Sequence, residues 1–151
     1  MVADIYPPLL AFHGLLRWFV LAAALAAVLV AFAGWSGTKP AGKLRLFTVV
    51  YVIAIDIQFL IGLVLFVWLS PVTQAAFADF AGAMKNKEPR FFTVEHTTTM
   101  FLALICAHLG AALSRKGRTE QSKHRGAAIA YSISLVLILA GIPWWRPLLR
   151  Y

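Results

Sequence analysis

Apolar residues dominate four stretches of the chain, and polar residues gather between them. The stretches cover about residues 8–35, 44–69, 91–114 and 126–145. Each reaches or approaches the ~20 residues that a helix needs to cross a hydrocarbon core of ~30 Å. Because lipid offers no water to backbone groups, each stretch is predicted to be a helix. The pattern therefore predicts a single all-α domain over residues 1–151, an antiparallel four-helix bundle integral to the lipid bilayer.

The connection between the second and third stretches is itself patterned. Ser70 is a residue type that caps helix N-termini, and Pro71 follows at the first helical position, where proline is tolerated. The apolar residues that then recur at helical spacing are Phe77, Phe80 and Met84. The pattern predicts a short helix over about residues 71–84, lying on the membrane interface.

Composition agrees with a membrane protein and changes how the charge is interpreted. The chain is 61% hydrophobic and 13% charged, whereas a soluble domain is about 45–50% apolar. The net charge of +8 would favour nucleic-acid binding in a soluble protein. Here most Lys and Arg residues lie between the apolar stretches, so no nucleic-acid partner is predicted. Cys106 is the single cysteine and is predicted to be a packing residue.

Positive charge is distributed unequally among the connections. The connection after the first stretch contains Lys39, Lys43 and Arg45. The connection after the third contains Arg115, Lys116, Arg118, Lys123 and Arg125, with one acidic residue, Glu120. Because Lys and Arg concentrate on the cytoplasmic side of membrane proteins, both connections are predicted to face the cytoplasm. Both termini and the connection from Ser70 to Arg90 are then predicted on the outer side.

Small residues recur on one face of two predicted helices. They are Ala23, Ala27 and Ala31 on the first helix, and Ala103, Ala107, Gly110 and Ser114 on the third. Small residues let membrane helices approach closely. Both stripes are predicted to be packing features.

The predicted topology brings ionisable and aromatic residues to the outer end of the bundle. They are His13, Arg17, Trp18, Glu95, His96, Trp144, Trp145 and Arg146. Structural roles are open to all of them. The tryptophans suit an interfacial belt, the arginines can reach headgroups, and the histidines can form hydrogen bonds between helices. Glu95 can pair with Arg17 or Arg90.

A haem b is the sharper hypothesis for this set. A six-coordinate haem in a bundle needs two imidazoles from different helices at one depth. His13 and His96 meet that requirement and are predicted to ligate the haem iron. Arg17 and Arg146 are predicted to pair with the propionates, and Glu95 or a backbone carbonyl is predicted to orient an imidazole.

Other polar residues lie away from this end. Asp56, near mid-membrane, is predicted to face the bundle interior, because a lipid-facing carboxylate is costly. Gln58 is two residues further along the helix and does not share its face. His108 is predicted to form an interhelical hydrogen bond, and His124, in a basic connection, is predicted to be solvated.

Four sequence blocks resemble a known family. They are HGLLRW (13–18), DIQFLIGLVLF (56–66), RFFTVEH (90–96) and AGIPWW (140–145). They look like a family of small four-helix bacterial membrane proteins often labelled cytochrome b, and the likeness spans nearly the whole chain. It implies a multi-pass protein of the bacterial inner membrane, with haem and electron transfer. By resemblance, the characteristic positions are His13, Arg17, Gln58, Gly62, Glu95, His96 and Pro143.

Three functions are carried forward as hypotheses. The first is a haem b protein that transfers electrons, with quinone as a candidate exchange partner. The second is a cofactor-free accessory subunit of a larger respiratory or photosynthetic membrane complex, with self-association as a further option. The third is a small transporter or proton-coupled carrier that uses Asp56 and Glu95. No catalytic residue is predicted.

Overall fold

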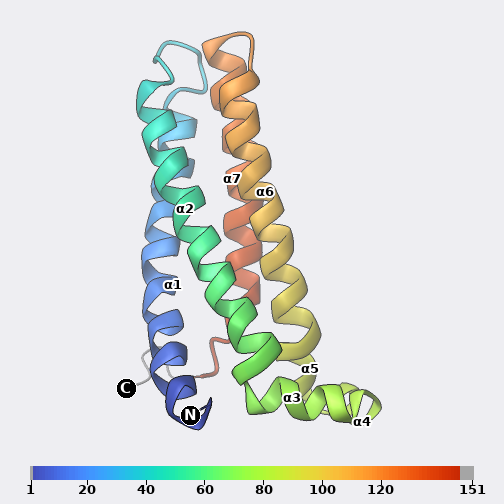
Figure 1. The fold of residues 1–151 in the computed structure, drawn as a ribbon. Helices are drawn as coiled ribbons and strands as arrows, with labels where there is room; N and C mark the ends of the chain where they lie inside the picture. The colour runs from blue at the N-terminus through green and yellow to red at the C-terminus, as the bar shows by residue number, and fades with distance from the viewer. Residues whose placement is uncertain (1, 147–151) are drawn as a thin grey trace.

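The computed structural model describes residues 2–146, and their regular secondary structure is entirely helical (Figure 1). The elements in chain order are α1 (Val2–Ala33), α2 (Gly42–Val64), η1 (Leu65–Leu69), α3 (Pro71–Ala78), α4 (Phe80–Lys85), α5 (Lys87–Arg90), η2 (Phe91–Glu95), α6 (His96–Lys116) and α7 (Glu120–Gly141). Four helical stretches are long and apolar enough to span a membrane: Asp4–Ala33, Gly42–Leu69, Lys87–Lys116 and Glu120–Gly141. The all-α fold class is confirmed.

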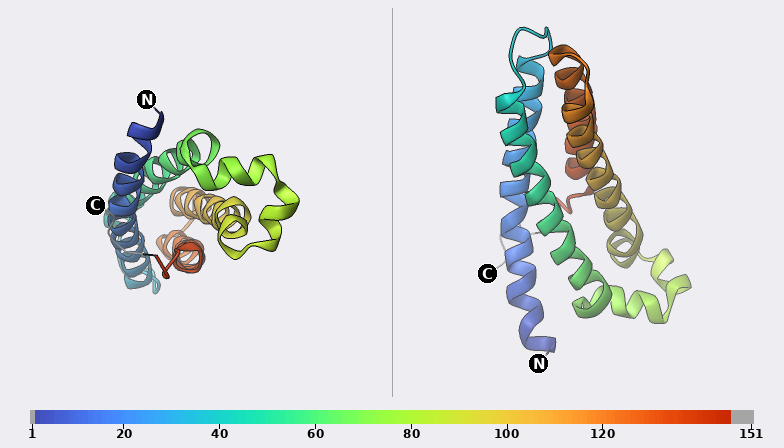
Figure 2. Two further views of the ribbon diagram at one scale, coloured as in Figure 1. Left: turned by 90° about the horizontal axis from the view of Figure 1, so that it is seen from below. Right: turned by 45° about the horizontal axis from the view of Figure 1, so that its top comes forward.

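The four long helices pack side by side (Figure 1). Short loops join α1 to α2 and α6 to α7 at one end, which we call the loop end. The opposite end, called the open end, carries the start of α1, the end of α7 and the α3–α5 segment. α1 packs against α2 and α7, and α6 packs against α7 and α2. Consequently α1 and α6 lie diagonally across the bundle (Figure 2).

Small residues and a tyrosine pair form the core in the half nearer the loop end. Both predicted small-residue stripes are buried, which confirms them as packing surfaces. Between them Tyr51 and Tyr131 meet edge to face with ring centroids 5.5 Å apart. The Tyr131 hydroxyl donates to Thr48 Oγ1 at 2.8 Å, and the Tyr51 hydroxyl lies 2.6 Å from Ser134 Oγ. Every hydroxyl in this pair thus has a partner inside the protein, which apolar surroundings require.

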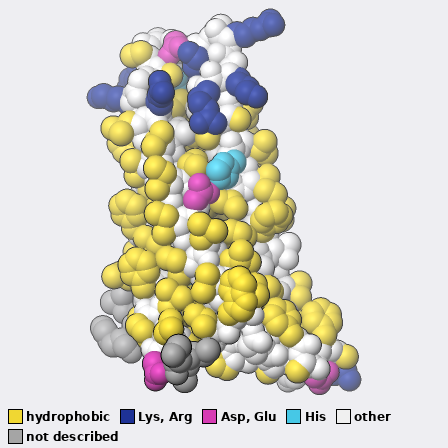
Figure 3. All heavy atoms as spheres, viewed as in Figure 1, with side chains coloured by type: hydrophobic (Ala, Val, Ile, Leu, Met, Phe, Trp, Pro, Cys, Tyr) yellow, Lys and Arg dark blue, Asp and Glu magenta, His cyan; other side chains and the backbone are white. Residues whose placement is uncertain are grey.

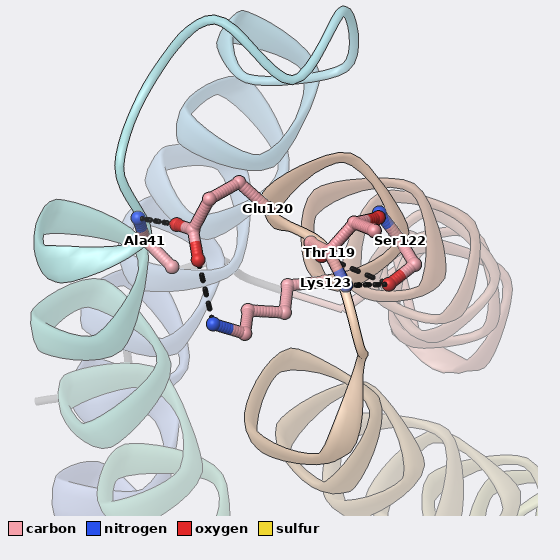
Figure 4. A network of polar contacts seen from close by, with 5 residues as sticks. All are labelled: Ala41, Thr119, Glu120, Ser122 and Lys123. Carbon is pink, nitrogen blue, oxygen red and sulfur yellow. Dashed lines mark hydrogen bonds and ion pairs between the residues drawn. The ribbon is translucent and has the colours of Figure 1, made fainter.

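The helix boundaries differ from the predicted ones at two places. α1 was predicted from about residue 8, but it begins at Val2 and passes through Pro7 and Pro8. Two prolines near a helix start deprive only early carbonyl groups of their donors, so the helix continues. α7 was predicted from about residue 126 but begins at Glu120. Thr119 and Ser122 form a capping box there, because each hydroxyl accepts from the other's backbone N–H (Figure 4).

The early start of α7 makes the prediction for His124 wrong. His124 is not solvated: it is 2% exposed and packs against Gly34, where a Cβ would overlap its ring. Glu120 holds the same corner together. Its carboxylate accepts from the backbone N–H of Ala41 at 2.5 Å and from Lys123 Nζ at 2.6 Å (Figure 4). The basic connection is therefore shorter than its run of charged residues predicted, because α7 begins at Glu120.

The predicted interfacial helix over residues 71–84 is present as two helices, α3 and α4. Ser70 caps α3 as predicted, since its hydroxyl accepts from the Thr73 N–H at 3.4 Å. Asp79 interrupts the helix and caps α4 by accepting from the Gly82 N–H at 2.9 Å. The segment turns away from the direction of the long helices and projects to one side at the open end (Figures 1 and 2).

Close packing at Gly110 yields a stability prediction. A Cβ at Gly110 would overlap the Tyr131 ring, so Gly110→Ala must displace Tyr131 and weaken its bond to Thr48. Overpacking of this kind costs about 1–3 kcal/mol. We expect a lower thermal unfolding midpoint for Gly110→Ala in detergent. Gly42→Ala is the matched control, because a Cβ there meets nothing within 4 Å. Equal midpoints for the two variants would contradict the packing described here.

Candidate functional site

A cavity of about 180 Å³ lies among all four long helices in the half nearer the open end. Most of its lining is apolar, which is typical of a ligand pocket in a bundle. The strongly polar side chains that reach it are His13, Arg17, Gln58, His96 and Arg146. Four of these five were predicted as site residues from the sequence, and the cavity brings those four together.

His96, the first residue of α6, is oriented by the end of α7. Its Nδ1 lies 2.8 Å from the backbone carbonyl oxygen of Gly141. A carbonyl oxygen only accepts, so Nδ1 carries the proton and Nε2 has a lone pair. That carbonyl is available because α7 ends at Gly141 and Pro143 follows, which cannot continue the helix. Among the described residues no hydrogen bond occupies Nε2 of His96, so it is an acceptor at the cavity.

His13, on α1, is held by Gln58 of α2. The Gln58 amide nitrogen donates to the His13 backbone carbonyl at 3.0 Å and lies 3.4 Å from His13 Nε2. Only the amide nitrogen of Gln58 can donate to a carbonyl oxygen, so this contact identifies the nitrogen side of the amide. The same nitrogen faces Nε2 of His13, so Nε2 is the acceptor and Nδ1 carries the proton. Nδ1 is buried and has no hydrogen-bond partner among the described residues. An unpaired buried donor costs about 1–3 kcal/mol, so a hydrogen-bond acceptor within reach of Nδ1 would be favourable here.

Gly62 allows this arrangement. A Cβ at Gly62 would lie 3.1 Å from Cε1 of His13, so any side chain there would press on the imidazole. Gln58 and Gly62 are one helical turn apart and face the same imidazole. Gln58 was not among the predicted haem-binding residues, although the family resemblance gave Gln58 and Gly62 as characteristic positions. Its position one turn from a glycine on an otherwise apolar helix is a second signal in the sequence.

Arg17 and Arg146 place positive charge at the cavity. Arg17 stacks over the Trp18 ring, 5.3 Å from its centroid. Arg146 stacks over the Phe92 ring at 4.2 Å and forms an ion pair with Glu88 of α5. The cation–π contacts orient each guanidinium group, and a guanidinium carries five N–H donors.

Glu95 does not reach the cavity. It lies one residue before His96, which separates the two side chains by about 100° around the helix. Its Oε1 accepts from Arg90 Nε at 2.8 Å on the exposed side of the molecule. Of the two partners considered for Glu95, the structure therefore selects Arg90. The backbone carbonyl of Gly141, not Glu95, orients the imidazole of His96.

Asp56 faces outward, so the prediction that it faces the bundle interior is wrong. Its Oδ1 lies 2.8 Å from Nε2 of His108 on α6, and the two side chains are 39% and 52% exposed. The bond from α6 to α2 confirms the predicted interhelical role of His108. Gln58 points inward, as expected because Asp56 and Gln58 lie on different faces of α2.

Two π-helical segments border the cavity. η1 follows α2 and η2 precedes α6, and Leu65, Phe66 and Phe92 from these segments contribute to the lining. π-helical turns inside α-helices occur frequently at functional sites. Sequence periodicity did not reveal them, because one extra residue in a turn leaves an all-apolar pattern unchanged.

The two imidazole side chains of the cavity suit a haem, but the cavity volume does not. His13 and His96 come from diagonal helices, their ring centroids are 6.5 Å apart, and His96 has the tautomer of a metal ligand. However, the Gln58 amide lies against Nε2 of His13. An engineered cavity of ~150 Å³ holds one benzene, so 180 Å³ fits one ring and not a four-ring porphyrin. The cavity as it stands does not fit haem b, which stays a prediction.

The described residues contain no group of three or more His, Cys, Asp or Glu side chains placed to hold a metal ion. Comparison with protein-family models, with curated proteins and with solved structures gives no match for this chain. The argument for function therefore depends on the geometry of the cavity.

The tautomer of His96 is open to direct measurement. We expect ¹⁵N NMR of histidine-labelled protein to show a neutral His96 protonated at Nδ1, because the Gly141 carbonyl accepts that proton. The His96→Asn variant assigns the signal by its loss. A ring protonated at Nε2 would contradict the geometry that leaves Nε2 as the acceptor at the cavity.

Proposed function

We propose that the protein is a multi-pass protein of the bacterial inner membrane, an antiparallel four-helix bundle with both termini and the α3–α4 segment outside. The support is the distribution of charge. On the face shown in Figure 3, Lys and Arg side chains gather at the loop end, while apolar side chains form a belt across the middle of the molecule. Such an excess of positive charge is typical of the cytoplasmic side. The cavity then lies in the outer leaflet.

Within this frame the proposed function is binding of the ring headgroup of a membrane quinone, in the service of electron transfer. One observation carries it: a cavity of about 180 Å³ holds an acceptor nitrogen of His96 between apolar walls and two guanidinium groups. The volume suits a single substituted ring. A site within a membrane-spanning bundle favours a lipophilic ligand, and an isoprenoid tail can lie along the apolar lining.

The polar groups match the two oxygens of such a ring. In the reduced ligand each oxygen is a hydroxyl, and Nε2 of His96 accepts one O–H. In the oxidised ligand each oxygen is a carbonyl that only accepts, and Arg17 or Arg146 donates to it. His96 therefore favours the reduced form and the arginines favour the oxidised form.

A titration tests this proposal. Wild-type protein, purified in detergent and freed of lipid-soluble quinones, should show quenching of its tryptophan fluorescence when a short-tailed ubiquinol analogue is added. His96→Leu should weaken the affinity for the quinol by about tenfold, the equivalent of one lost hydrogen bond. Glu95→Gln is the matched control, one residue away and outside the cavity, and should bind as wild type does.

Two results would contradict quinone binding. One is a wild-type protein that does not bind either redox form. The other is equal quinol affinity in wild type and His96→Leu, which would place any ligand elsewhere. In the first case the cofactor-free accessory subunit becomes the better hypothesis.

The second candidate function is a haem b electron carrier, favoured by the two imidazoles from diagonal helices with centroids 6.5 Å apart. Bound between them, haem would supply one-electron chemistry, with its potential set by the axial ligands and the nearby arginines. It requires Gln58 to leave His13 and the helices to separate at the open end.

A dithionite-reduced absorption spectrum decides the haem hypothesis. Protein expressed with ample haem supply should show sharp reduced bands if His13 and His96 are ligands. His13→Ala and His96→Ala should then lose these bands, while His124→Ala keeps them. A colourless wild-type protein contradicts haem and leaves quinone binding unaffected.

A further inference from the structure

The exposed pair of Asp56 and His108 lies where lipid is expected. Asp56 is near the middle of the 28-residue apolar stretch Gly42–Leu69, and His108 faces it from α6. Figure 3 shows an acidic side chain beside a histidine within the apolar belt.

The neighbours of the pair are exposed and apolar. On α2 they are Ile53, Ile57 and Leu60, which are 53%, 44% and 60% exposed, and on α6 they include Ile105 and Leu109. A shallow groove beside the pair is lined by Leu104, Ile105, His108 and Leu109. We call this surface the α2–α6 face. An ionisable pair in such surroundings is costly unless its remaining polar atoms find partners.

The remaining polar atoms of the pair are one donor and one acceptor. Nε2 of His108 and Oδ1 of Asp56 satisfy each other at 2.8 Å. Among the described residues no hydrogen bond uses Nδ1 of His108 or Oδ2 of Asp56. In a pair without net charge, the form that hydrocarbon favours, Nδ1 of His108 carries a proton and Oδ2 of Asp56 keeps its lone pairs, whichever of the two residues holds the shared proton. Hydrocarbon offers a partner to neither atom.

A two-fold axis satisfies both atoms at once. In an isologous dimer, when residue i of the first copy contacts residue j of the second, residue j of the first copy also contacts residue i of the second. Nδ1–H of His108 in one copy can donate to Oδ2 of Asp56 in the other, and the reverse bond forms by symmetry. We propose that two copies of this chain pair in the membrane through the α2–α6 face, with Asp56 and His108 of both copies forming a closed ring of four hydrogen-bonded side chains.

The proposal does not depend on what the cavity binds. The α2–α6 face is formed by outward-facing residues, and the cavity polar groups point into the bundle. Polar side chains join membrane helices through such hydrogen bonds, and the apolar neighbours supply close packing around them.

The test uses full-length protein reconstituted alone in lipid vesicles, with the oligomeric state read by single-molecule subunit counting at several protein-to-lipid ratios. Wild type should be dimeric. Asp56→Leu and His108→Leu should each dissociate about tenfold or more readily, since each removes both intermolecular bonds. The exchanged double variant, Asp56→His with His108→Asp, keeps one donor and one acceptor and should restore dimers. Helical circular dichroism confirms that each variant is folded.

Cross-linking locates the interface. In a Cys106→Ala background, Ile105→Cys should form an intermolecular disulfide on mild oxidation. Leu29→Cys should not, although Leu29 on α1 is 59% exposed and Ile105 is 39% exposed. Monomeric wild type, dimers that tolerate both leucine variants, or cross-linking only at Leu29→Cys would each overturn the proposal.

Discussion

A polar side chain inside a membrane bundle must find its hydrogen-bond partner within protein, because hydrocarbon supplies none. The loop-end half of the bundle satisfies this constraint completely at the tyrosine pair: Tyr131 bonds Thr48, and Tyr51 meets Ser134, whose hydroxyl reaches the Ala103 carbonyl. Small residues bring the helices close enough for these short bonds. Buried ring nitrogens without a partner among the described residues occur in both halves, namely Nδ1 of His13 at the open end and both nitrogens of His124 near the loop end. Of these two rings only His13 lines the cavity of about 180 Å³, which points to the open end as the place of function.

Depth along a helix could be predicted from the sequence, and rotation about the helix axis could not. The depth of His13, Arg17, His96 and Arg146 follows from where each apolar stretch begins or ends, and the structure brings all four to one cavity. Rotation has to be inferred from polar residues on a helix, and α2 has very few. The rotation of α2 was instead inferred from the assumption that Asp56 must face inward. That inference did not consider His108, which lies on the same surface and pairs with Asp56.

Local chemistry explains the remaining differences. Charged residues before Gly126 indicated a loop, but the capping box of Thr119 and Ser122 starts α7 at Glu120 and buries His124. Glu95 was grouped with His96 because the two are adjacent in sequence, although adjacent helical residues point in different directions. The π-helical segments leave no mark on an apolar pattern. Cavity size also escaped prediction, because it depends on how far four packed helices separate at one end.

The distribution of ionisable residues over the lipid-facing surface connects the two proposals. From Trp18 to Ala33 α1 has no ionisable residue, and from Gly126 to Gly141 α7 has only Tyr131, which is buried. These helices can face lipid without any partner. The α2–α6 face cannot, because of Asp56 and His108. A second copy on that face would leave α1 and α7 uncovered. The proposed dimer interface and the proposed ligand cavity therefore involve different side chains of the same bundle.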